Sequence, residues 1–432
     1  MRALLAFTGS RGDAQPGILL ARALRARGHE VTLALAPNLL AFAAEYGVPA
    51  VAFGRDSAEL LRAQRTDHRF TSRDPRARLR ALFELQRRGV PEALNGLRTL
   101  APGHDVLVAG MAGEEVGESV ARAVRLPFAA LHFFPIQPNT AVPVVPARWA
   151  ERVPGVVHRW GWSALARARA AALAPVLPTV GRSPAAVPTT VGTLWIQAYD
   201  ARLFPGLAEE ISGPFTGFPV DLPTGSTASG RDRGIRRRSG AEPPSPSAAL
   251  HSWLDAGTAP IYVGFGSMDV GDPADLVAIL RSVCARRGRR LLLVSGWASI
   301  VPQFGADLAV VDQVDHAEVL PRCVAAVHHG GAGTTAAALR AGVPQVICSV
   351  QADQPYWGQA LRRLGLAATM PAKQLTAPRL QALLDRVDTP GARHRAHAYA
   401  AGFTTDGVER AADAIEALAN IPQPIHVAGR PL

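Results

Sequence analysis

The sequence has little cysteine and no recognisable metal-binding motif, and each shortage excludes a class of protein. Its three cysteines, Cys284, Cys323 and Cys348, are odd in number and lack CxxC spacing, which argues against a disulfide framework and against a zinc site. The 432 residues also hold no Asp-x-Asp pair of the kind that binds Mg²⁺ or Mn²⁺. We therefore expect a protein of the reducing cytoplasm that uses no metal ion and no other cofactor.

Long apolar segments are also absent. Five apolar residues follow Arg2 before Thr8 and Gly9, which is too few for the core of a signal peptide. No stretch approaches the roughly 18 apolar residues that a membrane-spanning helix needs. We expect neither secretion nor insertion into a membrane.

Positive charge is abundant, but it is not clustered. The formal net charge is +11 and the sequence pI is about 10.7, which by themselves suggest nucleic acid or an acidic membrane as a partner. Lys373 is the only lysine, and the arginines are scattered at helical spacing through stretches such as Leu19 to Arg27. The basic run from Arg231 to Arg238 lies in a Gly/Ser/Pro-rich stretch, and no nucleic-acid-binding module is visible. We expect solvated helix faces and no nucleic-acid partner, and we leave peripheral contact with the inner face of a membrane open.

Apolar runs alternate with amphipathic stretches in both halves of the chain. An apolar run from Arg2 to Phe7 breaks at Gly9, and an amphipathic stretch follows from Pro16 to Arg27. A second series of the same kind starts with Pro260 to Phe265. This alternation predicts an α/β fold with parallel, doubly wound sheets, and 432 residues suit two Rossmann-like domains of about 200 residues each.

Composition also predicts where the domains end. Much Gly, Pro, Ser, Thr and Arg and little apolar content mark residues 221–247 as a linker. Helical but irregular insertions at 58–100 and 135–172, the second with three tryptophans, are where a substrate pocket could be built. The predicted division is an N-terminal domain at 1–220, a linker with a flexible middle at 221–257, a C-terminal domain at 258–420 and a loose tail at 421–432.

A glycine-rich turn carries the strongest chemical signal. The strand predicted at Val324 to Val327 is followed by HHGGAGTT, from His328 to Thr335, and then by an Ala/Leu-rich helical stretch. Outward-pointing N–H groups and the dipole of the following helix make such a turn a cradle for a diphosphate. A tight turn without a ligand is the alternative interpretation. We expect His329 to donate a hydrogen bond to the phosphate or leaving group, and His328 to be structural.

The motifs PRC, HHGGAGTT, RAGVP and DQPYWG, between Pro321 and Gly365, together resemble the donor-site signature of family-one glycosyltransferases. The resemblance is to the bacterial branch related to sterol glucosyltransferases and to glycopeptide- and macrolide-type natural-product glycosyltransferases. TGSRGDAQP, from Thr8 to Pro16, is similar to the acceptor-side loop of that branch, and GFGSM at 264–268 is similar to its first donor-domain loop. The resemblance implies a GT-B fold, in which two Rossmann-like domains face each other and bind the acceptor and the nucleotide-sugar donor respectively.

The resemblance also implies roles for individual residues on the donor side. Ser267 would help to hold the diphosphate from the facing loop, and Asp353 with Gln354 would bind sugar hydroxyls. Gln313 stands where plant relatives carry a tryptophan that stacks on the nucleobase, so a UDP-linked and a dTDP-linked donor both stay open. The residues implied to hold the diphosphate are His329, Gly330, Gly331, Gly333 and Thr334.

On the acceptor side, the resemblance makes Asp13 the base that deprotonates the acceptor hydroxyl. Asp13 follows the first strand, at the carboxyl end of the sheet, where open α/β folds place their sites. Ser10 and Asp13 are also good helix-capping types, so capping without catalysis is the alternative. Glu114 and His132 are reserve candidates for the base.

The implied reaction is an inverting, metal-independent transfer of a hexose in one displacement, with the departing charge absorbed by His329 and the glycine-rich turn. The expected acceptor is hydrophobic and hydroxylated: a sterol, lipid, glycopeptide or polyketide. Two alternatives are a nucleotide-sugar epimerase or hydrolase of the same fold and a non-catalytic helper protein.

Overall fold

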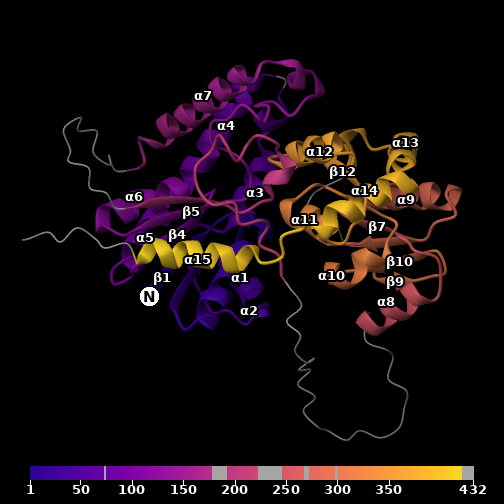
Figure 1. The fold of residues 1–432 in the computed structure, drawn as a ribbon, viewed down its shortest axis with the longest axis horizontal. Coiled ribbons are helices and arrows are strands. Elements are labelled where there is room, and N and C mark those ends of the chain that lie inside the picture. The colour runs from indigo at the N-terminus through magenta and orange to yellow at the C-terminus, as the bar shows by residue number, and fades with distance from the viewer. Residues whose placement is uncertain (73, 178–191, 222–245, 267–271, 297–299, 421–432) are drawn as a thin grey trace, which may run out of the picture. The chain divides into compact units, whose positions relative to one another are not determined.

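The computed structural model describes residues 1–72, 74–177, 192–221, 246–266, 272–296 and 300–420. The chain divides into two compact units: Met1–Val145, Trp149–Val220 and Thr404–Leu432 form the first, and Pro146–Arg148 with Asp221–Phe403 form the second (Figure 1). The predicted flexible middle of the linker and the predicted loose tail lie outside the described residues.

Each unit is built on one doubly wound sheet, which confirms the predicted fold class. The strands of the first sheet are β1 (Arg2–Phe7), β2 (Glu30–Leu35), β3 (Ala50–Ala52), β4 (Val106–Gly110), β5 (Phe128–His132) and β6 (Thr193–Gln197). They are all parallel, in the order β3-β2-β1-β4-β5-β6. Chain order therefore reverses between β1 and β4.

The first sheet is covered by helices on both faces. Alternation along β1 sends Ala3, Leu5 and Phe7 into one core and Leu4 and Ala6 into the other, so each strand contributes to both faces. α1, α2 and α15 contribute to one core, and α5 and α6 to the other. The helices of this unit are α1 (Arg11–Ala26), α2 (Leu40–Glu45), α3 (Ser57–Thr66), α4 (Pro75–Arg88), α5 (Val90–Leu100), α6 (Glu114–Val124), α7 (Gly155–Leu173) and α15 (Gly407–Ala419).

The first helix starts earlier than predicted. We expected its amphipathic stretch to begin at Pro16, but α1 begins at Arg11 and Pro16 lies inside it. The reason is local: Ser10 is the N-cap, and the side chain of Asp13, three residues later, reaches back to it. Asp13 therefore lies in the first turn of a helix and not in the loop where it was predicted.

The last helix corrects the predicted C-terminal domain boundary. We placed residues 258–420 in one domain, but α15 packs in the first unit, against α1 (Figure 1). Its buried face joins the first core, and Arg27 at the end of α1 donates to Asp413 at 2.6 Å and to Glu416 at 3.2 Å. The face consists of Ala411, Ala412, Ile415 and Leu418.

The second sheet has the same strand order as the first, with one short strand added at its edge. Its strands are β7 (Ile261–Gly264), β8 (Leu291–Val294), β9 (Gln303–Phe304), β10 (Leu308–Val311), β11 (Ala325–His328), β12 (Gln345–Ser349) and β13 (Ala367–Pro371). The order is β13-β12-β11-β7-β8-β10-β9, which matches the first sheet when it is read from β10 to β13, and the strands are parallel except for the short edge strand β9. Chain order here reverses between β7 and β11.

The helices of the second unit also lie on both faces of its sheet. α9 and α13 join one core, and α8 with α11 joins the other. α8 corrects the predicted linker: residues 246–255 were assigned to it, but Leu250, Trp253 and Leu254 of this helix are buried. The helices are α8 (Pro246–Asp255), α9 (Pro273–Arg286), α10 (His316–Val319), α11 (Ala332–Arg340), α12 (Gln354–Arg363), α13 (Ala377–Val387) and α14 (Pro390–Ala401).

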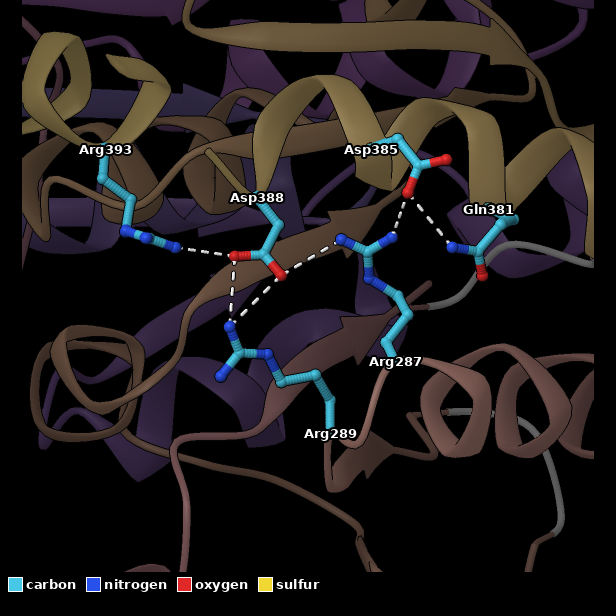
Figure 2. A network of polar contacts seen from close by, with 6 residues as sticks. All are labelled: Arg287, Arg289, Gln381, Asp385, Asp388 and Arg393. Atoms are coloured by element: carbon cyan, nitrogen blue, oxygen red, sulfur yellow. Dashed lines mark hydrogen bonds and ion pairs between the residues drawn. The ribbon is translucent and has the colours of Figure 1, made fainter. Parts of the chain in front are cut away.

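A buried aspartate joins four elements at the amino end of β8. Figure 2 shows Asp388, at the end of α13, surrounded by three arginines. Arg393 of α14 approaches it at 2.6 Å, Arg287 at the end of α9 at 3.1 Å and Arg289 before β8 at 3.4 Å. The Asp388 side chain is only 6% exposed, so these contacts lie in a poorly solvated environment.

Replacing this aspartate should destabilise the second unit strongly. Asp388→Ala leaves three arginines without their shared carboxylate, and we expect the free energy of unfolding to fall by about 3–5 kcal/mol. The matched control is Asp385→Ala, which also removes a carboxylate from this network. The Asp385 side chain is 58% exposed. That variant should lose less than about 1 kcal/mol. Urea denaturation of the full chain measures both, and equal losses would contradict a structural role for Asp388.

Candidate functional site

Several of the predicted site residues follow the strands at which chain order reverses in each sheet. In an open α/β sheet the loops after the two strands at such a switch point diverge and leave a crevice at the carboxyl ends of the strands. In the first unit, Asp13 follows β1 and Glu114 follows β4. In the second unit, Gly266 follows β7 and His329 follows β11.

Asp13 is held by one carboxylate oxygen only. Its Oδ2 accepts the backbone N–H of Ser10 at 2.7 Å and the Ser10 hydroxyl at 2.8 Å. No described residue donates to Oδ1. Burial raises the pKa of Asp13, and the two bonds from Ser10 oppose that shift. The arrangement therefore combines helix capping with a fixed carboxylate that is a stronger base than a free aspartate.

Gly9 makes room for this carboxylate, and sequence reasoning assigned it no role. Its φ is +112°, and a Cβ at this position would lie 2.4 Å from Oδ2 of Asp13 and 2.8 Å from its Cγ. Gly12 differs, because a Cβ there would meet only the Ser10 hydroxyl, at 3.5 Å. The available signal was a glycine directly before a Ser-x-x-Asp capping pattern.

The two reserve candidates form a single pair. Glu114 is the first residue of α6; its Oε2 lies 3.0 Å from Nε2 of His132, and its Oε1 accepts the Trp195 indole N–H at 3.0 Å. Burial would raise the pKa of Glu114, but the bond and charge of His132 and the bond from Trp195 hold it below its ordinary value. Both carboxylate oxygens are thus engaged, which makes Glu114 a poorer base than Asp13.

In the second unit, the glycine-rich turn leaves the start of α11 open. Its N-cap is Gly331, which has no side chain to cap the helix. The N–H of Thr335 bonds to the Gly331 carbonyl at 2.9 Å, whereas the N–H groups of Ala332, Gly333 and Thr334 meet no acceptor among the described residues. Three such donors at the positive end of a helix dipole favour an anion.

His328 has a structural role, as predicted. It is fully buried; its Nδ1 accepts the Gly330 N–H at 3.1 Å, and its Nε2 donates to the Gln345 side-chain oxygen at 2.8 Å. Burial, with the neighbouring His329, lowers the pKa of His328 to about 3. The N–H of Gly330 therefore points into the protein, although sequence reasoning had placed it in the diphosphate cradle.

His329 lies half-exposed between two backbone segments. A Cβ on Gly331 would come within 2.5 Å of its Nε2, and one on Gly266 within 3.4 Å of its Cε1. Burial lowers the pKa of His329 to about 4, against an opposing effect of the Gly264 carbonyl, so the ring is neutral near pH 7. Its Nδ1 is buried without a hydrogen-bond partner among the described residues. Ser267, expected nearby, lies outside the described residues.

The two residues expected to bind sugar hydroxyls differ in exposure. Gln354 is buried, and its side-chain oxygen accepts the N–H groups of Val350 at 2.8 Å and Gln351 at 3.1 Å, so it fixes the loop before α12. Asp353 is half-exposed and is oriented by the Trp357 indole N–H at 2.7 Å from its Oδ2. Asp353 is the better placed of the two to meet a ligand.

Two further features lie at the same carboxyl edge of the second sheet. The residue before Asp353, Ala352, has a φ of +54°, a conformation that costs a non-glycine residue about 1–2 kcal/mol. Gln313, proposed to contact the base, is exposed shortly after β10. Its neighbour Asp312 accepts the Ser295 hydroxyl at 3.0 Å.

No helix in the described part of the chain has the length and apolar character that crossing a membrane requires. The same residues contain no group of three or more His, Cys, Asp or Glu side chains arranged to hold a metal ion.

Comparison with known proteins gives a family match and relatives that align over most of the chain. Residues 297–408 match the family described as "Erythromycin biosynthesis protein CIII-like, C-terminal domain". An uncharacterized glycosyltransferase of Mycobacterium tuberculosis is 38% identical over 84% of this chain and 85% of its own. The vancomycin aglycone glucosyltransferase of Amycolatopsis orientalis is 32% identical over 95% of this chain and 96% of its own.

A solved structure shows the same fold. The glycosyltransferase VinC, in complex with dTDP, is similar with a TM-score of 0.61 over 97% of this chain and 99% of its own, at 20% sequence identity. At this identity the likeness concerns the fold alone.

The buried histidine should make the protein sensitive to acid. An unfolded histidine titrates near pH 6.5, whereas folded His328 stays neutral down to about pH 3, so the unfolded state binds the extra proton between these values. The contribution of neutral His328 to the free energy of unfolding is complete above about pH 6.5 and is lost as the pH falls toward 3. His328→Asn keeps an acceptor for the Gly330 N–H but cannot titrate.

Between pH 7 and 5 the wild type should therefore lose about 2 kcal/mol more stability than His328→Asn. Urea denaturation at both pH values measures the difference. The control, His394→Asn, changes an exposed histidine on α14 of the same unit and should keep the acid dependence of the wild type.

Proposed function

The chain belongs to the family-one glycosyltransferases of GT-B fold, and on that premise we propose that it transfers a hexose from a nucleotide diphosphate sugar to a hydroxyl of a hydrophobic acceptor, with inversion and without a metal ion. The open start of α11 beside His329 carries this proposal. It offers fixed N–H donors and a neutral imidazole at a switch point, and no carboxylate of the described residues caps them.

The donor diphosphate would bind at the start of α11. Its oxygens would accept the N–H groups of Ala332, Gly333 and Thr334 and a ring N–H of His329, and the helix dipole would stabilise the charge that grows on the leaving group. These donors are in place before the reaction and can take over the charge compensation that a divalent cation provides elsewhere. Asp353 would accept hydrogen bonds from sugar hydroxyls.

The nucleotide and the sugar are proposed from relatives. VinC was solved with dTDP, which supports a thymidine diphosphate, and the Amycolatopsis relative is named a glucosyltransferase, which supports glucose. A uridine diphosphate hexose enters the test as well, because Gln313 leaves the base of the donor open. The same relative acts on the vancomycin aglycone by its name, which supports a natural-product acceptor with apolar parts.

The acceptor hydroxyl would be activated by Asp13. Oδ1, which has no donor among the described residues, takes the hydroxyl proton while the acceptor oxygen attacks the anomeric carbon. The bond from that carbon to the diphosphate oxygen breaks, and the electron pair leaves on the nucleoside diphosphate. One displacement inverts the anomeric configuration and needs no covalent sugar intermediate.

The donor half can be tested by binding alone. In Gly331→Ala the added Cβ would approach Nε2 of His329 to 2.5 Å, so the ring must move from the start of α11. We expect at least a tenfold weaker affinity for dTDP or UDP by titration calorimetry, because a misplaced donor no longer meets the phosphate. Gly391→Ala in the same unit, where the nearest atom is 3.5 Å away, should bind as the wild type does. Unchanged binding by Gly331→Ala would remove this site from the proposal.

The acceptor half is tested by the isosteric change Asp13→Asn. An amide retains the shape of the carboxylate but is not a base, so kcat should fall by about 10²–10⁴ while the affinity for the nucleotide stays the same. The assay follows the mass of product from UDP-glucose and dTDP-sugars on a panel of hydrophobic alcohols with EDTA present, and NMR of the product reports the anomeric configuration.

A second pair of variants separates the carboxylate's position from its chemistry. Gly9→Ala displaces the Asp13 side chain and should also lose activity, whereas Gly12→Ala should be nearly neutral. Full activity of Asp13→Asn would contradict the mechanism. Conversion of the donor without acceptor would favour an epimerase or hydrolase, and activity that EDTA abolishes would contradict metal independence.

A further inference from the structure

Exposed apolar side chains gather on one part of the first unit. Eight of the thirteen large hydrophobic residues that are exposed in the described chain lie on α4 or between residues 145 and 165. The most exposed of the eight are Trp160, at 67%, and Trp149, at 61%. Isolated exposed hydrophobic residues are ordinary, but a local concentration with two solvent-facing tryptophans indicates an interaction surface.

The outer face of α7 is apolar by helical spacing. Val156 and Trp160 are four residues apart and therefore neighbours on one face; Val157 adjoins them, and Ala164 continues the row. The opposite face anchors the helix: Trp162 is 4% exposed and donates its indole N–H to the Val142 carbonyl at 2.8 Å. The outward face thus remains apolar although the helix already has a buried side.

Trp149 is held near the start of the same helix. It lies in the short helical turn Arg148–Arg152, and His158 of α7 hydrogen-bonds the Ala150 carbonyl of that turn at 3.0 Å. We call the surface made by Trp149, Val156, Val157 and Trp160 the α7 patch.

The charge around the α7 patch is almost entirely positive. Residues 145–173 contain five arginines and one acidic residue, Glu151. Arg159 is paired with Glu210 at 2.7 Å, and Arg169 with Glu115. The other three, Arg148, Arg152 and Arg167, are exposed and have no acidic partner among the described residues. Tryptophan and valine beside unpaired arginines are the composition of a surface that binds at the interface of an anionic membrane.

We propose that the α7 patch docks this protein reversibly on an anionic lipid bilayer, with Trp149, Val156, Val157 and Trp160 inserted at the headgroup level and Arg152 and Arg167 against lipid phosphates. A second copy of the chain fits less well, because a two-fold contact through this patch would bring the same arginines against each other. The proposal stands independently of the transferase reaction.

Vesicle flotation with the full chain tests this surface. Wild type should float with phosphatidylcholine vesicles that contain phosphatidylglycerol, and should float much less with phosphatidylcholine alone or at high salt. Trp160→Ser should weaken partitioning about tenfold, the loss expected when one large apolar side chain is no longer buried. Arg167→Glu changes two charges and should weaken it roughly 25-fold.

Matched controls come from the second unit. Phe304→Ser removes an aromatic side chain that is 42% exposed, and Arg386→Glu reverses an exposed arginine without an acidic partner among the described residues; both should float as the wild type does. The thermal midpoint of Trp160→Ser should stay within about two degrees of wild type, because the ring is mostly solvated.

Three results would overturn the proposal. One is the absence of flotation with anionic vesicles. Another is equal flotation with zwitterionic vesicles at all salt concentrations. The third is a concentration-dependent dimer in light scattering that Trp160→Ser abolishes, because the patch would then join two copies of the chain.

Discussion

The N–H groups in the first turn of a helix need acceptors. Two helices at equivalent positions beside the two sheets of this protein meet that need differently. α6 and α11 each follow the strand at which chain order reverses, and each begins after a glycine N-cap. α6 carries Glu114 and Glu115 in its first turn, so the protein's own carboxylates face the positive end of the dipole. α11 carries none there, which leaves its start to an external anion. This difference agrees with the proposed division into acceptor and donor halves.

Close approach of the backbone is the second constraint. The Asp13 carboxylate and the His329 ring both occupy space that a side chain on a neighbouring residue would fill, from Gly9 in one unit and Gly331 in the other. Each group is thus positioned in part by a missing side chain. Hydrogen bonds fix the surroundings: Ser10 donates to one oxygen of Asp13, and His328 accepts the Gly330 N–H and so turns it inward.

Burial then adjusts the chemistry of the positioned groups. It raises the pKa of Asp13, which makes the carboxylate more basic, and lowers the pKa of His329 to about 4, which keeps the ring neutral. In the proposed site, a neutral ring would donate one N–H to a diphosphate without attracting other anions as strongly as an imidazolium would. The amino end of the second sheet is organised differently, by ion pairs around Asp388.

By itself, the sequence determined the repeated strand and helix pattern and the glycine-rich turn, because both depend on residues that are neighbours in the chain. It also indicated Asp13, through the resemblance of the loop after the first strand, while the capping pattern around Asp13 left a purely structural role as the alternative. The tertiary structure decided which atoms are available: Oδ1 of Asp13 has no donor among the described residues, whereas the Gly330 N–H and the Gln354 oxygen are occupied by internal bonds. It also decided that α15 returns to the first unit. The apolar pattern of this helix would suit the core of either unit, and only its packing in the folded chain shows that it joins the first.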